Sequence, residues 1–244
     1  MKVTSYSDPK SPISEAYRSI RTNIAYSNLD EDVKTIVVTS AQKDEGKSTV
    51  VANLAASFAS LEDKKVLVMD GDLRNPTVHK MFGISNIHGV TDVLTGSKNF
   101  LDCVHKSKVE GLNILTCGKI PPNPAEVLGS KKMRSFVEEL KNHYDYIFID
   151  APPVGMVTDA GVLASYTDGT VLIVSSKEAD IESVKIAKER LEKVDANILG
   201  AVLNKYEAEG SNYDYYSYYY NSDGNNNSRS KNKKSRGKHS KKSA

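Results

Sequence analysis

Cysteine is scarce in this sequence, and no long hydrophobic run is present. The 244 residues include only two cysteines, Cys103 and Cys117, and they do not form a CxxC motif. The five histidines are scattered without the spacing of a metal site. The N-terminus has no apolar run that resembles a signal peptide, and no stretch approaches the roughly 18 apolar residues of a membrane-spanning helix. We therefore expect a reduced, cytoplasmic protein that does not cross a membrane.

Charge is distributed unevenly along the chain. Residues 221–244 contain eight Lys or Arg and one acidic residue, whereas residues 1–220 contain 25 basic and 30 acidic residues. The net charge of +2 therefore combines a mildly acidic body with a basic tail. A block so rich in Lys, Ser, Asn and Gly is typical of disorder. Two interpretations stay open for it, attraction to anionic lipids and a merely solubilising tail.

The pattern of apolar residues divides the chain into three zones. In residues 1–30 we predict a helix for self-association, with Ser11 as its N-cap and Pro12 at its first position. Residues 31–210 alternate short apolar runs with amphipathic stretches, and residues 211–244 hold a tyrosine cluster and the basic tail. We predict buried strands at 35–40, 65–70, 112–117, 146–150, 170–175 and 198–204, and helices at 47–60, 131–142 and 179–194. This alternation predicts an α/β fold with a doubly wound, mostly parallel sheet flanked by helices.

The segment TSAQKDEGKST, residues 39–49, carries the strongest local signal. It follows a predicted strand and opens a predicted helix. Gly46, Lys47 and Ser48 match the end of the Walker A motif GxxxxGK[ST], although Ala41 replaces its first glycine. Backbone N–H groups at a helix N-terminus bind phosphate oxygens, Lys47 can reach the β- and γ-phosphates, and the Ser48 hydroxyl can ligate Mg²⁺. The segment therefore predicts a site for ATP and Mg²⁺.

Acidic residues follow two of the other predicted strands. VLVMDGDLR places Asp70 and Asp72 after the second strand, ahead of Arg74, and YIFIDAPP places Asp150 where a Walker B acid belongs. The carboxyl ends of strands in an open α/β sheet form its ligand crevice, so we expect three carboxylates beside the phosphate loop. Their mutual repulsion is costly unless a metal ion lies among them. The alternative is that these acids only cap helices or turns.

The motifs together resemble two related families. A P-loop with DxD after the second strand resembles the deviant Walker ATPases of the MinD/ParA-like class, but Gln42 stands where their motif KGGxGK[ST] begins with a signature lysine. The chain is more similar to the bacterial tyrosine kinases (BY-kinases), as the cytoplasmic kinase subunit of capsule or exopolysaccharide synthesis. That resemblance covers nearly the whole chain and rests on five segments: SAQKDEGKST, VLVMDGDLR, YIFIDAPP, Glu15-xx-Arg18-xx-Arg21 and the tyrosine cluster.

Roles for the site residues follow from the motif chemistry and from this resemblance. Lys47 and Mg²⁺ would neutralise charge in the transition state, and the metal would be held by Ser48 and Asp150 with support from Asp72. The resemblance assigns Asp70 as the group that accepts or orients the tyrosine proton. Asn204, at the end of the last predicted strand, either contacts the adenine or is simply a strand-end residue. The residues assigned to the nucleotide are Asp44, Glu45, Gly46, Lys47, Ser48, Thr49 and Asn204.

The tyrosine cluster SNYDYYSYYY, residues 211–220, is interpreted as the substrate. A tail that enters another subunit's site cannot be held in a core, and several tyrosines allow graded negative charge. The predicted phosphoacceptors are Tyr213, Tyr215, Tyr216, Tyr218, Tyr219 and Tyr220. The resemblance implies a homo-oligomeric ring in which Glu15 of one subunit meets Arg18 and Arg21 of the next, because identical head-to-tail contacts can close into rings.

The resemblance also implies partners. A kinase subunit without its own membrane span would be recruited to the inner face of the cell membrane by a separate transmembrane activator. A tyrosine phosphatase would reverse the modification, other protein substrates are possible, and no specific nucleic acid is expected.

Two alternatives remain at this stage. One is a MinD/ParA-like partition or positioning ATPase, in which water accepts the phosphate and the basic tail binds DNA without sequence preference. The other is a nucleotide-gated scaffold without catalytic activity, since the loop around Ala41 and Lys43-Asp44 is atypical.

Overall fold

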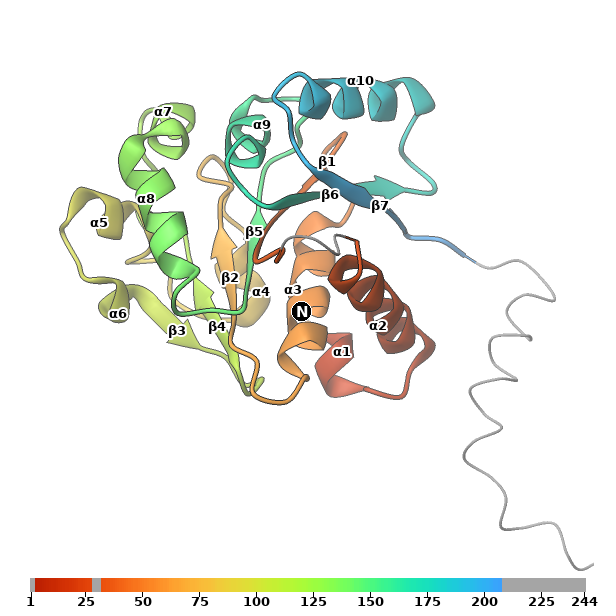
Figure 1. Cartoon of the computed structure of the whole chain (residues 1–244), viewed down its shortest axis with the longest axis horizontal. Helices are drawn as coiled ribbons and strands as arrows, with labels where there is room; N and C mark the ends of the chain where they lie inside the picture. Colours follow the sequence, from red (N-terminus) through yellow and green to blue (C-terminus); the bar gives the residue numbers. More distant parts are fainter. Residues whose placement is uncertain (1–2, 28–31, 208–244) are drawn as a thin grey trace, which may run out of the picture. The chain divides into compact units, whose positions relative to one another are not determined.

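The computed structural model describes residues 3–27 and 32–207, drawn in colour in Figure 1. Within these residues, seven strands form one sheet in the order β3-β4-β2-β5-β1-β6-β7. All neighbouring pairs are parallel except β3 and β4, which are antiparallel. The strands are β1 (Thr35–Ser40), β2 (Val66–Asp70), β3 (Val104–Lys106), β4 (Leu112–Leu115), β5 (Tyr146–Asp150), β6 (Gly169–Ser175) and β7 (Ile198–Asn204).

Helices cover both faces of the sheet, as Figure 1 shows. Their buried residues form two cores, one with α2, α3 and α4 and the other with α5 to α10. The helices are α1 (Thr4–Ser7), α2 (Pro12–Ala25), α3 (Lys47–Ala59), α4 (Val78–Phe82), α5 (Val90–Thr95), α6 (Phe100–Cys103), α7 (Pro124–Gly129), α8 (Lys131–Leu140), α9 (Asp159–Ala164) and α10 (Ile181–Glu192). The predicted doubly wound α/β fold is confirmed.

The continuous apolar runs are explained by this two-sided burial. Successive side chains of a strand point to opposite faces, so a strand between two helical layers needs apolar residues at every position. In β1, Ile36 and Val38 belong to one core and Val37 to the other. Strand β3 was not predicted, because its three residues at the sheet edge are half-buried or exposed and carry no such pattern.

The N-terminal helix α2 begins where the sequence predicts. The Ser11 hydroxyl accepts a hydrogen bond from the Ser14 N–H at 3.2 Å, and Pro12 occupies the first turn. Tyr17 and Ile24 are buried in the same core as α3, so α2 packs on the body of the protein. The predicted division into residues 1–30, 31–210 and 211–244 stays a prediction, because residues 28–31 and 208–244 lie outside the described parts.

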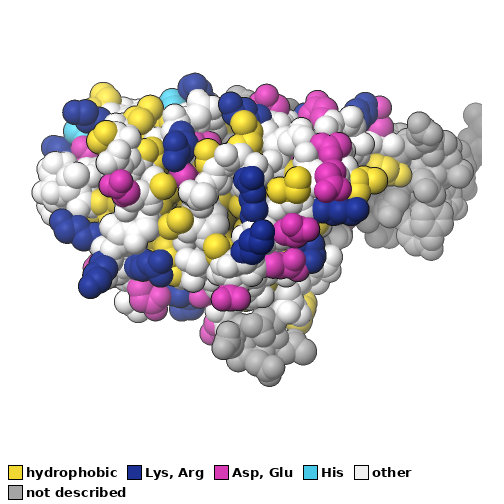
Figure 2. All heavy atoms as spheres, turned by 90° about the horizontal axis from the view of Figure 1, so that it is seen from above, with side chains coloured by type: hydrophobic (Ala, Val, Ile, Leu, Met, Phe, Trp, Pro, Cys, Tyr) yellow, Lys and Arg dark blue, Asp and Glu magenta, His cyan; other side chains and the backbone are white. Residues whose placement is uncertain are grey.

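Two further features of the described residues concern the hydrophobicity of the helices and the distribution of charge on the surface. No helix in residues 3–27 or 32–207 is both long and apolar enough to cross a bilayer. On the face shown in Figure 2, basic and acidic side chains are interspersed.

Candidate active site

The phosphate loop connects β1 to α3. It leaves the sheet after Ser40 and ends at Gly46, the N-cap of α3, which begins at Lys47. Gly46 has φ +88° and Asp44 has φ +61°, so both lie in the left-handed region that a tight turn needs. A Cβ at position 46 would lie only 2.2 Å from Asn204 Nδ2. Glycine is thus required there for its conformation and for the close approach.

Two side chains, Glu45 within the loop and Asn204 outside it, hold the loop in place. Glu45 is fully buried, and its carboxylate accepts hydrogen bonds from the N–H of Gln42 at 2.7 Å and of Ser175 at 3.1 Å. Asn204, at the end of β7, donates its Nδ2 hydrogen to the Glu45 carbonyl oxygen at 2.8 Å. The loop is therefore fixed to both β6 and β7.

Asp70 and Asp150 are register partners on the adjacent strands β2 and β5. Asp70 is fully buried and accepts hydrogen bonds from the backbone N–H groups of Asp72 (3.3 Å), Thr77 (3.1 Å) and Val78 (3.0 Å). Burial first, and then the nearby Asp150 charge, raise the pKa of Asp70 well above its ordinary value. The predicted convergence of carboxylates is therefore present, and it is electrostatically costly.

Asp150 lacks the backbone hydrogen bonds that Asp70 accepts. Both of its carboxylate oxygens are buried, and neither has a hydrogen-bond partner of good geometry among the described residues. Burial raises the pKa of Asp150 to about 6, although the neighbouring Ser48 hydroxyl and the Lys47 charge oppose the shift. The Ser48 hydroxyl itself lies 2.9 Å from that of Thr77. An unpaired carboxylate beside hydroxyl oxygens is the hard-oxygen environment that Mg²⁺ prefers.

These residues fit Mg²⁺ only as part of a nucleotide complex. Within the described residues, no group of three or more His, Cys, Asp or Glu could hold a metal ion by itself. Mg²⁺ usually keeps several waters and binds through one or two carboxylates together with substrate phosphates. The predicted ligand set of Ser48, Asp72 and Asp150 is compatible with that mode of binding, and the assignment stays a prediction.

The segment after β2 turns back toward the loop. The Asp72 carboxylate accepts hydrogen bonds from the N–H of Asn75 at 2.9 Å and of Arg74 at 3.3 Å, and burial raises its pKa. The Arg74 guanidinium makes two bonds, of 2.8 and 2.9 Å, to the buried carboxylate of Asp159 at the start of α9. This bidentate pair anchors the segment that carries Asp72 to α9.

A cleft of about 620 Å³ opens over the loop, a size in the range of small-molecule sites. Of the residues assigned from sequence, Asp44, Gly46, Lys47, Ser48, Thr49 and Asp72 line it. Glu45, Asp70 and Asp150 are buried and Asn204 is half-buried, and none of these four residues lines the cleft. The remaining lining residues are Lys43, Arg74, Asn75, Thr77, Met81, Pro152, Pro153, Met156 and Val157.

Thr77 is the most informative residue among those that sequence reasoning missed. Its backbone N–H binds Asp70 and its hydroxyl faces Ser48, so it joins the two acidic strands to the loop. The available signal was its place after Asn75-Pro76 at the start of a helix, which is weak. Pro152 and Pro153 were visible in YIFIDAPP, but nothing in the sequence says that they face the cleft.

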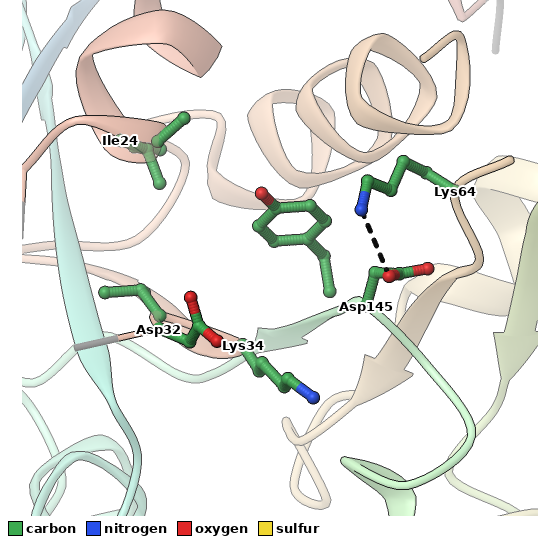
Figure 3. Close-up of a pocket in the computed structure, with 8 residues that line it drawn as sticks. Ile24, Asp32, Lys34, Lys64 and Asp145 are labelled. Atoms are coloured by element: carbon green, nitrogen blue, oxygen red, sulfur yellow. Dashed lines mark hydrogen bonds and ion pairs between the residues drawn. The ribbon is translucent and has the colours of Figure 1, made fainter. Parts of the chain in front are cut away.

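A smaller hollow of about 150 Å³ lies at the opposite end of the strands (Figure 3). Of its labelled residues, Lys34 and Asp145 directly precede β1 and β5, and Lys64 lies two positions before β2 and pairs with Asp145 at 3.2 Å. Ligands of open α/β sheets bind at the carboxyl ends of the strands, and this hollow is at the amino ends. We assign it no role in catalysis.

The predicted self-association residues all lie on α2 and have partners within the chain. Arg18 Nε donates to the Glu15 carboxylate at 2.5 Å, and its NH1 donates to the Pro9 carbonyl at 2.8 Å. Arg21 donates to the Ser57 carbonyl and, at 3.1 Å, to the Ser60 hydroxyl at the end of α3. Their role between subunits stays a prediction. The predicted phosphoacceptor tyrosines, in residues 211–220, lie outside the described residues.

Gln42, which replaces the signature lysine of partition ATPases, is held by its own chain. Its Nε2 lies 2.9 Å from Asp180 Oδ2 and 2.9 Å from the Ser183 hydroxyl, at the start of α10. The Gln42 side chain is neutral and its amide nitrogen is already hydrogen-bonded, so it does not provide the positive charge that a lysine at this position would.

Comparisons with known proteins agree with this geometry. A family model described as ParA, NUBPL iron-transfer P-loop NTPase, matches residues 32–236. The tyrosine-protein kinase YwqD of Bacillus subtilis is 44% identical over 88% of this chain and 90% of its own length. The tyrosine-protein kinase CpsD of Streptococcus agalactiae is 36% identical over 84% of this chain and 89% of its own length.

Solved structures show the same order of similarity. The chimerical protein CapA2B2 is 38% identical, covers 84% of this chain and 90% of its own, and superposes with a TM-score of 0.81. The septum site-determining protein MinD of Pyrococcus horikoshii, complexed with Mg-ADP, is 26% identical over 72% of each chain, with a TM-score of 0.61. The MinD-like proteins are thus the more distant relatives. The chain is a nucleotide-binding P-loop protein, and it belongs to the bacterial tyrosine-protein kinases.

Proposed function

We propose that this protein transfers the γ-phosphate of ATP to tyrosines in the C-terminal cluster of a neighbouring copy, and that this autokinase activity regulates capsule or exopolysaccharide synthesis. The observation that carries the proposal is a cleft lined by the phosphate loop and Asp72, with the buried Asp150 beside the loop residue Ser48, in a chain whose relatives at 36–44% identity are tyrosine-protein kinases. The tail begins at residue 211, after six residues that follow the end of β7, and it supplies six tyrosines within ten residues.

Phosphate binding is the task of the loop. Gly46, Lys47, Ser48 and Thr49, at the start of α3, line the cleft, so the positive end of the helix dipole and the ammonium would act on the same bound phosphates. Lys47 would hold the β- and γ-phosphates, and Ser48 and Thr49 would lie beside them. In this proposal the loop aligns the terminal phosphate, and such positioning is a large part of what a protein contributes to the catalysis of phosphoryl transfer.

Mg²⁺ would neutralise charge on the β- and γ-phosphates during transfer. The chain would hold it through the Ser48 hydroxyl and through Asp150, with Asp72 at the edge of the cleft. A bound cation would add to the effect of Lys47 and would coordinate the Asp150 oxygens, which otherwise lack hydrogen-bond partners. The electrostatic cost of burying this acid is thereby offset when the nucleotide complex forms.

The tyrosine hydroxyl must lose its proton during transfer. Its pKa is near 10 in water, so a carboxylate that accepts or orients the proton helps the reaction. We assign this role to Asp70, whose raised pKa makes it a stronger base than an ordinary aspartate. Asp72 lines the cleft, and the buried Asp70 accepts a hydrogen bond from the Asp72 N–H at 3.3 Å.

The proposed partners follow from the same assignment. Glu15, Arg18 and Arg21 would form the contact between copies in a ring, and a transmembrane activator would recruit the protein to the inner face of the membrane. A tyrosine phosphatase would reset the tail. Phosphorylated tails repel one another, so modification should loosen the ring.

Mass spectrometry of the tail after incubation with ATP and Mg²⁺ tests the proposal. We expect phosphate on residues of the 211–220 cluster, and none when Lys47→Met replaces the wild type. ATP hydrolysis without phosphotyrosine would indicate a MinD/ParA-like ATPase instead. Nucleotide binding without either reaction would indicate a scaffold.

A further inference from the structure

A groove of about 470 Å³ lies beside the cleft, between the phosphate loop and α10. Two residues, Lys43 of the loop and Met156 of the segment after β5, line both this groove and the cleft. The two spaces therefore meet at Lys43 and Met156, and we call the second space the α10 groove. The other residues that line it are Ala41, Gln42, Gly155, Ser183, Ile186 and Arg190.

The turn that carries Met156 is fixed against its surroundings on two sides. A Cβ at Gly155 would lie only 2.1 Å from the Ala41 carbonyl oxygen, so the backbone of the turn passes directly over the phosphate loop. On the other side, the Arg190 guanidinium of α10 donates to the Val154 carbonyl oxygen at 3.0 Å. Met156 itself is 51% exposed, so its side chain is available to a ligand at the junction of the cleft and the groove.

Apolar side chains form one wall of the cleft. Met156 and Val157 belong to this apolar wall together with Met81 of α4, and Pro152 and Pro153 also line the cleft. A triphosphate gains nothing from apolar contacts, whereas the ring of a tyrosine can bury its faces against them. The sulfur of methionine in particular makes favourable contacts with aromatic rings. The wall therefore favours an acceptor with an aromatic ring over serine or threonine.

The α10 groove carries positive charge. Lys43 and Arg190 line it, and none of its lining residues is acidic. Within residues 3–27 and 32–207, Lys43 has no hydrogen bond or ion pair, and Arg190 bonds only to the Val154 carbonyl. The nearby carboxylate of Asp180 is already bonded to the Gln42 amide at 2.9 Å. The groove therefore suits a ligand with negative charge.

The predicted acceptor segment has the matching composition. Residues 208–220 contain six tyrosines and two acids, Glu209 and Asp214, and no Lys or Arg. Asp214 stands between Tyr213 and Tyr215. Because consecutive Cα atoms are about 3.8 Å apart, either of these tyrosines in the cleft would bring the acid close to the adjoining groove.

We propose that the apolar wall and the α10 groove together bind the acceptor segment of a neighbouring copy. Met156 contacts the ring of the acceptor tyrosine, and Lys43 and Arg190 attract the acidic residue beside it. The site thus selects tyrosine in an acidic sequence. The inference rests on the proposed function, because it takes the cleft as the place of transfer, but it requires only that the segment binds.

Binding of labelled peptides to the full-length protein, measured by fluorescence anisotropy with Mg²⁺ and ADP, tests the inference without any transfer step. The natural peptide has the sequence of residues 208–220. The acid-free peptide carries Glu209→Gln and Asp214→Asn, and the serine peptide has serine in place of all six tyrosines. Every protein variant has the same tail, so competition from that tail is the same in each measurement.

Two variants are compared with matched controls. Met156→Ser removes the apolar contact, and Lys43→Gln removes one charge from the groove. The controls are Leu101→Ser on α6 and Lys108→Gln between β3 and β4, because both side chains are exposed and line neither the cleft nor the groove.

We expect the wild type to bind the natural peptide about 3- to 5-fold more tightly than the acid-free peptide, and at least about 10-fold more tightly than the serine peptide. Met156→Ser should weaken the natural and acid-free peptides alike, by about 3- to 10-fold. Lys43→Gln should lower the preference for the acidic peptide to less than about 2-fold. Both controls should bind as the wild type does.

The inference is overturned if the wild type does not bind the natural peptide, or binds the serine peptide equally well. It is also overturned if Met156→Ser binds the natural peptide as Leu101→Ser does, or if Lys43→Gln keeps the full preference for acidic residues. If the peptides bind as expected but ATP never yields phosphotyrosine, the proposed kinase function fails, while the binding inference is still decided by the affinities.

Discussion

Replacement of Asp150 by asparagine should stabilise the nucleotide-free protein while it removes activity. Asp150 is buried with both oxygens unpartnered, and its pKa is raised from 3.8 to about 6. Each pKa unit corresponds to about 1.4 kcal/mol, so the ionised carboxylate costs the fold about 3 kcal/mol at neutral pH. Asparagine keeps the shape without the charge. For a chain of this size, that gain raises the melting temperature by about 6–12 °C.

The sign of the pH dependence follows from the direction of the shift. A raised pKa means that the folded protein holds a proton that the unfolded chain has released, so wild-type stability falls as pH rises from about 4 to about 6. The advantage of Asp150→Asn is therefore complete above pH 6, shrinks through this window and is absent below it. Removal of the charge also relieves Asp70, whose pKa is raised in part by Asp150.

Thermal unfolding across this pH range, with EDTA and without nucleotide, measures the effect. Asp145→Asn is the control, because a hydrogen bond from the Lys65 N–H lowers the pKa of Asp145 and its replacement should destabilise the protein. Addition of Mg²⁺ and ATP should raise the melting temperature of the wild type more than that of Asp150→Asn. If Asp150→Asn melts at or below the wild-type temperature at pH 7.5, the buried charge is not the cost that we infer.

Two further changes test other parts of the structure. Arg74→Ala leaves the buried Asp159 carboxylate without its ion-pair partner, so we expect denaturant unfolding to show a free energy of unfolding lower by about 2 kcal/mol. Most of this loss should be recovered when Asp159→Ala is added, and equal stability of Arg74→Ala and wild type would contradict the prediction. Glu15→Ala should reduce self-association in sedimentation velocity but change the free energy of unfolding by less than about 0.5 kcal/mol, because its ion pair with Arg18 is half-exposed. Arg21→Ala should reduce self-association as well, and it should also lower the free energy of unfolding by about 1 kcal/mol, because its hydrogen bonds to the end of α3 are lost. Unchanged association of both α2 variants would remove these residues from any subunit contact.

The strands were predictable because burial on both faces leaves little freedom of sequence. The predicted bounds of β1, β5 and β7 match the structure residue for residue, and the N-cap at Ser11 is also correct. The convergence of Asp70, Asp72 and Asp150 with the loop followed from the rule that the carboxyl ends of strands share one edge. Local patterns and a general rule of topology were sufficient for these features.

Contacts between residues far apart in sequence could not be predicted in this way. Arg74 meets Asp159 across 85 positions, and Asn204 meets Glu45 across 159, with no periodicity or motif that links them. Thr77 lies beside Ser48 and Asp70 only because of the path that the chain takes after β2, and the sequence does not indicate that path. Sequence also did not reveal that Glu45 faces away from the cleft, because a loop of six residues gives no signal about which side chains turn inward.

Transfer between copies is the central claim, and a mixing experiment tests it most directly. A chain that ends at Glu209 keeps the cleft but lacks the tyrosine cluster, and the full-length Lys47→Met variant keeps the cluster but lacks the phosphate-binding lysine. We predict that phosphotyrosine appears on the Lys47→Met chain only when both are incubated together with ATP and Mg²⁺. If the mixture forms none while the truncated chain consumes ATP as fast as the full chain, the cleft does not serve a neighbour's tyrosines.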